Sequence, residues 1–127
     1  MLLNSKEKKI AYKLKSLLNK RGFIVDIKNS KNSKSIYLKL DNGACGAIRI
    51  SDHINFNTKC KFNIIKNYKG KRTSYSKGKV RKYYNFNSYG IVIADVESER
   101  SNKIIKDGFS KYKLLRDKYK NSNKIAA

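Results

Sequence analysis

The sequence between Asp52 and Asp95 contains no acidic residue, and basic and aromatic side chains are interleaved through it. Lysine and arginine bind the phosphates of a polyanion, with an affinity that falls as salt rises. Exposed aromatic rings stack on unpaired bases, which contributes roughly 1–3 kcal/mol per base. The residues predicted to contact phosphates are Lys66, Lys69, Lys71, Arg72, Lys77, Lys79, Arg81 and Lys82. Those predicted to stack or pack at the interface are Tyr75, Tyr83 and Tyr84, and those predicted near the sheet edge of the site are Arg49 and His53.

Catalysis by a general base would depend on His53, the one histidine of the sequence, which follows Asp52. A general base needs a partner that orients it, but neighbouring strand residues point to opposite faces of a sheet. We therefore interpret Asp52 and His53 as a strand end that hydrogen-bonds a turn. No catalytic residue is predicted.

A second group of candidates, Asp95, Glu97 and Glu99, occupies alternate positions where a strand is expected to meet a helix. Carboxylates bind divalent cations, and a small metal-dependent nuclease would need such a group. This nuclease, with or without His53, is the second hypothesis. The favoured interpretation is that the acids interact with the dipole at a helix N-terminus, so no metal site is predicted.

Other chemistries have no support in the sequence. It lacks the glycine-rich loops that bind nucleotides and the motifs of zinc proteases and serine hydrolases, so we expect no cofactor and no small-molecule substrate. Cys45 and Cys60 have no Cys-x-x-Cys spacing, which argues against a zinc site. They are interpreted as free thiols in a reducing cytosol.

The formal net charge is +22 over 127 residues. Self-repulsion at this charge opposes compaction, and a bound polyanion would relieve it. An anionic membrane would require a basic amphipathic helix with a free apolar face, whereas the basic residues here fall largely in expected strands and loops. Nucleic acid is therefore the first-ranked partner and no membrane partner is expected. The N-terminal residues show no signal peptide, so a cytoplasmic location is expected.

The pattern of apolar residues predicts one domain over residues 1–127. Residues 4–20 are predicted to form a helix that begins with a capping-box spacing and buries Ile10, Leu14, Leu17 and Leu18. Strands are predicted at 23–28, 35–41, 47–51, 61–66 and 89–95. The segment Asp41-Asn42-Gly43 predicts a hairpin turn. A long basic loop or hairpin arm is expected at 67–82.

A final helix is predicted to begin at Ser98 or Ser101, to run to about Lys120, and to be weakened by Gly108. Its buried stripe is predicted to be Ile105, Phe109, Tyr112, Leu115 and Tyr119. Residues 121–127 are expected to fray. The predicted fold class is α+β: an N-terminal helix, a four- to five-stranded, mostly antiparallel sheet with the basic arm, and a C-terminal helix.

Two stretches, residues 35–53 and 89–120, carry a further signal. The first contains the segments Ser35-Ile36-Tyr37 and Ile48-Arg49-Ile50-Ser51-Asp52-His53, and the second an apolar segment followed by a lysine-rich helix. In both, the sequence resembles small phage-encoded anti-CRISPR proteins that inhibit type II Cas nucleases. The resemblance implies a basic α–β–α domain that binds the Cas nuclease together with its guide RNA.

The leading hypothesis is a non-enzymatic, strongly basic phage or mobile-element protein. It would bind RNA, DNA or a complex of a Cas nuclease with guide RNA, and inhibit that complex in the host bacterial cell. The third hypothesis is a plain double-stranded RNA- or DNA-binding module. It shares the order of helix, sheet and helix, but the sequence lacks the Gly/Lys cluster that would open its last helix.

Overall fold

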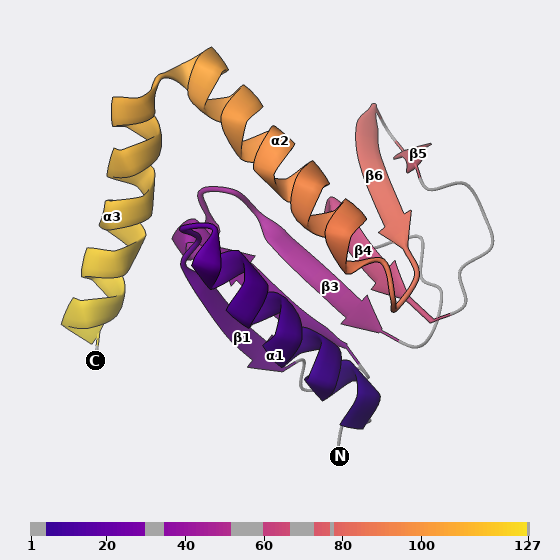
Figure 1. Cartoon of the computed structure of the whole chain (residues 1–127). Helices are drawn as coiled ribbons and strands as arrows, with labels where there is room; N and C mark the ends of the chain where they lie inside the picture. The colour runs from indigo at the N-terminus through magenta and orange to yellow at the C-terminus, as the bar shows by residue number, and fades with distance from the viewer. Residues whose placement is uncertain (1–4, 30–34, 52–59, 67–72, 77, 127) are drawn as a thin grey trace.

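The computed structural model describes residues 5–29, 35–51, 60–66, 73–76 and 78–126 (Figure 1). Its helices are α1 (Ser5–Lys20), α2 (Tyr89–Asp107) and α3 (Phe109–Ala126), with a short 3-10 turn, η1 (Asp41–Gly43). Its strands are β1 (Val25–Asn29), β2 (Ile36–Leu40), β3 (Ala47–Ser51), β4 (Phe62–Ile65), β5 (Thr73–Ser76) and β6 (Lys79–Tyr84). The predicted α+β class, with a helix before the sheet, is confirmed, whereas the one predicted C-terminal helix is two helices, α2 and α3.

The strands form one mixed sheet of six strands in the order β1-β2-β3-β4-β6-β5. The pairs β1–β2, β2–β3 and β5–β6 are antiparallel, whereas β4 runs parallel to both β3 and β6. The sheet is thus larger and less antiparallel than predicted. The hairpin of β2 and β3 lies where Asp41-Asn42-Gly43 predicts it, with Leu38 opposite Ile48.

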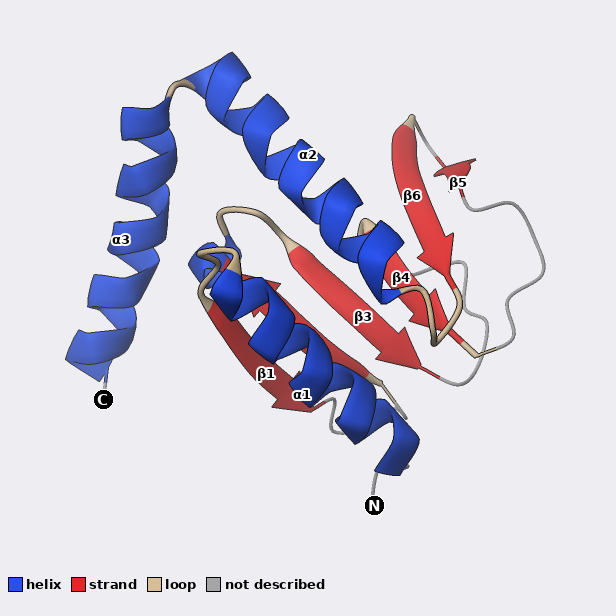
Figure 2. Ribbon diagram, in the orientation of Figure 1, coloured by secondary structure: helices blue, strands red, loops and turns tan. Residues whose placement is uncertain are grey.

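Helices α1 and α2 lie on the same face of the sheet (Figures 1 and 2). Helix α1 contributes Ile10, Leu14 and Leu18 to the core, as its period predicts, and Leu17 packs against them. It ends at Lys20 and is followed by a turn at Gly22, whose φ of 87° is readily adopted by glycine. The buried residues of the facing strands include Ile36, Leu38, Ile48, Ile50, Phe62 and Ile64.

Residues 89–95 are not the predicted strand but the first turns of α2. A short apolar run fits a buried strand and a buried helix equally well, and here the helix is formed. Val92 and Val96, one turn apart, are fully buried, whereas Ile91 is 45% exposed. The buried positions therefore recur with the helical period, which a single apolar run did not reveal.

Gly108 divides the predicted final helix into α2 and α3, because its φ of 92° interrupts the helical backbone. The helix axis turns sharply at this elbow (Figure 2), so the predicted stripe is only partly buried. Tyr112 is buried and Leu115 packs against the core, but Ile105 is 81% and Phe109 58% exposed. The side chain of Tyr119 lies outside the described residues.

Asp41 joins the sheet to both C-terminal helices. Its fully buried carboxylate accepts hydrogen bonds from the Ile24 N–H at 2.9 Å and from the Tyr112 hydroxyl at 2.5 Å. Arg100 Nε lies 3.2 Å from the same carboxylate. The Arg100 guanidinium lies 4.4 Å from the centre of the Phe23 ring. One carboxylate thus holds together a strand, α2 and α3.

Neighbouring contacts strengthen this junction. Asn42 Nδ2 donates to the Arg116 carbonyl at 3.1 Å, and Lys103 Nζ donates to the Ala44 carbonyl at 2.6 Å. Burial, followed by the hydrogen bond to Asp41, raises the pKa of Tyr112, and burial also raises the pKa of the Cys45 thiol. Both groups therefore stay neutral at physiological pH and add no second negative charge beside Asp41. The positive partner of Asp41 is Arg100.

We expect Asp41→Asn to lower the free energy of unfolding by about 3–5 kcal/mol, the usual effect of removing one partner of a buried ion pair. Asparagine tolerates the positive φ of this position, 49°, so the variant isolates the charge. Urea denaturation measures the effect.

The matched control is Arg21→Gln, which removes the exposed ion pair between Arg21 and Glu97. An exposed pair of this kind contributes only about 0–1 kcal/mol. Equal losses in the two variants would contradict the role assigned to Asp41.

Candidate nucleic-acid interface

The part of the predicted basic segment that the structure describes is a hairpin, which we call the basic arm (residues 73–76 and 78–84). Strand β5 pairs antiparallel with β6, and Ser76 lies opposite Lys79. Gly78 has a φ of 78° in the turn between them, a conformation that glycine adopts without strain. The arm forms the edge of the sheet opposite to β1. Of the two predicted alternatives, a long loop and a hairpin arm, the described residues form the hairpin arm.

The arm carries several predicted contact residues at its surface. The Tyr75 side chain is 76% exposed, the largest exposure among the aromatic residues singled out for stacking. Lys79 is exposed, and so is Lys66 at the end of β4. The Lys82 Nζ lies 5.9 Å from the centre of the Phe62 ring. Tyr75, Lys66 and Lys79 are therefore placed where an external partner can reach them.

A cleft of ≈ 270 Å³ lies beside the arm and is lined by Lys61, Lys79, Val80 and Arg81. Arg81 Nη1 is buried and has no hydrogen-bond partner among the described residues. An arginine N–H is a strong donor to phosphate oxygens. Lys61, which the sequence prediction omitted, lies 2.5 Å from Glu99. Of the cations that line the cleft, Lys79 is the exposed one, whereas Arg81 Nη1 is buried and Lys61 is paired with Glu99.

Three predicted contact residues are buried, and their prediction as surface contacts was wrong. Arg49 is 3%, Tyr83 1% and Tyr84 2% exposed. Tyr84 lies among the core residues and its hydroxyl donates to Asp95 at 2.7 Å. Tyr83 points to the other face of the sheet, opposite Asn63 in register. Strand β6 is thus buried on both faces at its C-terminal end, which a basic and aromatic composition does not reveal.

Arg49 lies at the centre of the sheet and not at its edge. It is in register with Tyr37 on β2 and with Asn63 on β4. Its Nε donates to Ser35 Oγ at 3.1 Å in a buried contact, and Ser51 is also fully buried. The residues of the Ser-x-Tyr and Ile-Arg-Ile-Ser segments that the structure describes therefore build the interior of the sheet.

The remaining predicted contact residues lie outside the described parts of the chain. They are His53, Lys69, Lys71, Arg72 and Lys77. Their prediction as phosphate or sheet-edge contacts stays a prediction. The expected fraying at 121–127 is likewise untested, because α3 runs to Ala126 but its last side chains are not described.

The acids of the nuclease hypothesis lie along α2 and contact cations and a hydroxyl. Glu97 lies 3.0 Å from Arg21, Glu99 2.5 Å from Lys61, and Asp95 accepts from Tyr84. Within the described ranges, no three histidine, cysteine or acidic side chains are grouped so that they could hold a metal ion. This arrangement gives the nuclease hypothesis no supporting geometry.

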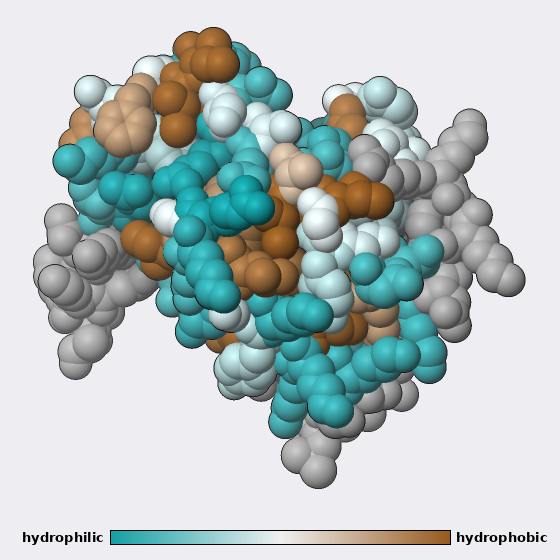
Figure 3. Space-filling view, viewed as in Figure 1, coloured by the Kyte–Doolittle hydropathy of each residue, from teal (hydrophilic) through white to brown (hydrophobic). Residues whose placement is uncertain are grey.

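A second basic surface lies on α1, and it was not included among the predicted contacts. Tyr12 is 64% exposed on this helix, and its exposed neighbours are Lys8, Lys9, Lys13 and Lys20. Figure 3 shows that hydrophilic side chains cover much of the face on which the helices lie. The spacing of basic residues between the buried positions of α1 is the signal that identifies this surface.

Comparison with protein-family models, with the curated proteins and with the solved structures finds no match. Among the helices that the structure describes, none is both long and apolar enough to cross a membrane.

We expect Arg49→Gln to lower the free energy of unfolding by about 1.5–3 kcal/mol, because it removes a buried hydrogen bond made by a charged group. The folded variant should bind RNA with unchanged salt dependence. Lys79→Gln should leave the free energy of unfolding unchanged and should weaken the salt dependence of RNA binding. Thermal unfolding and fluorescence anisotropy distinguish the two. A stable Arg49→Gln protein with weakened RNA binding would contradict the assignment of Arg49 to the interior.

Proposed function

We propose that this chain is a non-enzymatic protein that binds nucleic acid mainly through its phosphates. One observation carries the proposal. In the described residues, the exposed charged residues are all basic, whereas the acidic residues are buried or half-buried. Several of the acids contact basic side chains directly, as Asp41 does Arg100 and Glu99 does Lys61. The outward field is therefore of one sign, which favours a polyanionic ligand.

The basic arm supports single-stranded nucleic acid as the ligand. Lys79 of the arm is exposed and can contact a phosphate backbone, and a ring as exposed as that of Tyr75 can stack on an unpaired base. The cleft that Lys79 lines also contains Lys61 and Arg81, whose positive charges favour a phosphate beside Lys79. Stacking and phosphate contacts tolerate any base, so we propose binding with little sequence preference.

The wider proposal is that the nucleic acid is the guide RNA of a type II Cas nuclease, and that binding inhibits the nuclease. It rests on the resemblance of residues 35–53 and 89–120 and on the basic surface. The described motif residues of the first stretch, such as Arg49 and Ser51, are buried. Any inhibitory contact is therefore proposed for the exposed arm and not for this motif.

We expect Tyr75→Ala to weaken binding to a short single-stranded RNA by roughly 1–3 kcal/mol, the contribution of one stacked base. Tyr12→Ala is the matched control, since Tyr12 is also exposed but lies on α1. Fluorescence anisotropy with intact RNA measures both affinities. Equal effects in the two variants, or none, would remove the arm from the proposed interface.

The affinity for RNA should fall steeply between roughly 50 and 300 mM salt, and Lys66→Gln with Lys79→Gln should flatten the slope by about 0.7 for each phosphate that is no longer neutralised. Lys106→Gln, which removes an exposed charge near the end of α2, is the control. The RNA should remain uncut when Mg²⁺ or Mn²⁺ is added. Salt-independent affinity would contradict the electrostatic mechanism, and RNA cleavage that Glu97→Ala abolishes would restore the nuclease hypothesis.

Inhibition of a guide-loaded type II Cas nuclease can be measured as the fraction of target DNA that stays uncut. The wild-type protein should protect the target. Combined Tyr75→Ala and Lys79→Glu should reduce protection, whereas Lys106→Glu should not. Full DNA cleavage in the presence of wild-type protein that binds RNA would contradict inhibition while leaving nucleic-acid binding intact.

A further inference from the structure

Strand β1 is an edge of the sheet. It pairs with β2 on one side, and no strand in the described ranges pairs with the other. Ile24 and Asp41 lie opposite each other, one position beyond the pair of Val25 and Leu40. The Asp41 N–H donates to the Ile24 carbonyl at 2.7 Å, so Ile24 and Asp41 form a hydrogen-bonded pair. Hydrogen-bonded pairs alternate along an antiparallel ladder. The backbone groups of Val25 and Ile27 therefore point away from β2.

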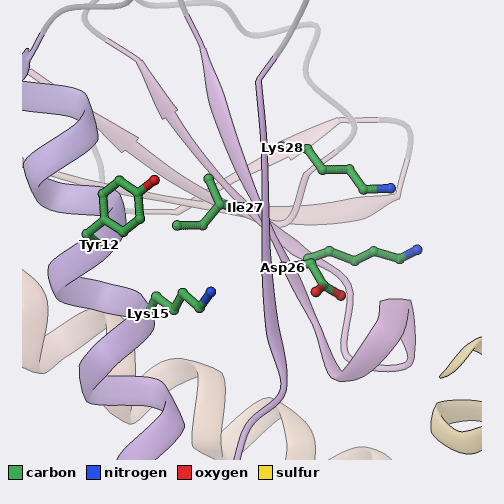
Figure 4. A pocket seen from close by; sticks show the side chains of 6 residues that line it. Tyr12, Lys15, Asp26, Ile27 and Lys28 are labelled. Carbon is green, nitrogen blue, oxygen red and sulfur yellow. The ribbon is translucent and has the colours of Figure 1, made fainter. Parts of the chain in front are cut away.

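A cleft of ≈ 510 Å³ lies along this edge, on both sides of the strand. Tyr12 and Lys15 of α1 lie on one side, and Ile27 points toward them (Figure 4). Asp26 and Lys28 point to the other side, where Lys39 of β2 completes the lining. The cleft thus presents Ile27 and the Tyr12 ring, with Lys15 beside them, on one side of β1, and two lysines with Asp26 on the other.

We propose that β1 is a docking edge for an extended, acidic segment of a protein partner, which adds to the sheet as a further strand. Strand addition uses the outward backbone groups for affinity and alternate side-chain positions for specificity. Apolar residues of the segment lie against Ile27 and Tyr12. Its acidic residues, which alternate with them, lie against the exposed Lys28.

Net charge and backbone chemistry decide between this occupant and two others. A second copy of the chain would bring together two molecules with a net charge of +22 each, and this repulsion opposes self-association. A nucleic-acid strand would leave the outward N–H and C=O groups of β1 without strand partners. An acidic peptide pairs with these backbone groups and carries the charge opposite to that of the chain.

The docking edge is separate from the proposed nucleic-acid surface of the arm, because β1 and β5 are opposite ends of the sheet. A basic protein that inhibits a ribonucleoprotein would gain by contacting RNA at one end and protein at the other. Strand addition at β1 does not require inhibition of a ribonucleoprotein, since the cleft and the outward backbone groups of β1 are present without it.

The test is an NMR titration of the full chain with a short synthetic peptide of alternating Glu and Val. Binding should shift the amide signals of Val25 and Ile27 and protect those amides from hydrogen exchange. Ile27→Pro removes one outward N–H while leaving the ladder to β2 intact, because proline is tolerated on the open side of an edge strand. It should weaken binding by roughly fivefold or more, the effect of about one backbone hydrogen bond.

Lys28→Glu is the second variant, and it leaves the backbone unchanged. It should weaken binding of the same peptide, whereas Lys106→Glu, distant from β1, should not. Peptide binding unchanged in both Ile27→Pro and Lys28→Glu would overturn the proposal. So would a short oligothymidine that shifts the Val25 and Ile27 amides more strongly than the peptide, because the edge would then be a nucleic-acid site.

Discussion

The buried carboxylate of Asp41 is the interaction on which the arrangement of the C-terminal half depends. Helix α3 contacts the rest of the chain mainly through the turn at Asp41–Gly43 and through α2, and Tyr112 is its one fully buried side chain in the described part. Tyr112 and Arg100 both contact the same carboxylate. Without this anion, a partly buried arginine from α2 and a hydroxyl from α3 would lose their shared partner.

In a chain with this excess of positive charge, several of the few acids contact basic side chains. Asp41 does so between η1 and the C-terminal helices, and Glu97 and Glu99 link α2 to Arg21 and Lys61. The acids therefore hold the layers together, while the lysines lie at the surface. The same distribution that stabilises the fold gives the surface one sign, which is why we assign nucleic-acid binding to the surface as a whole and to the basic arm in particular.

Local patterns predicted the elements whose period is unambiguous. Helix α1 and the hairpin of β2 and β3 have clear spacing and turn residues, and both form as expected. Residues 89–95 do not form the predicted strand, because an apolar run without alternation fits a buried helix as well as a buried strand. Among the candidate site residues, Tyr75, Lys66 and Lys79 are exposed as required, but Arg49, Tyr83 and Tyr84 are buried. Burial on both faces of β3 and β6 depends on which strands are neighbours, and the parallel pairing of β4 with both is a long-range feature that local spacing does not encode.

We propose that single-stranded nucleic acid binds to the exposed basic arm and not to the motif residues inside the sheet. The decisive measurement is an amide-resolved NMR titration of the whole chain with a short single-stranded RNA. We expect shifts at Tyr75, Lys79 and Lys66, with Arg49, Asn63 and Ile27 unaffected. Saturable binding that shifts Arg49 and Asn63 while Tyr75 and Lys79 stay unchanged, or no binding at low salt, would contradict it.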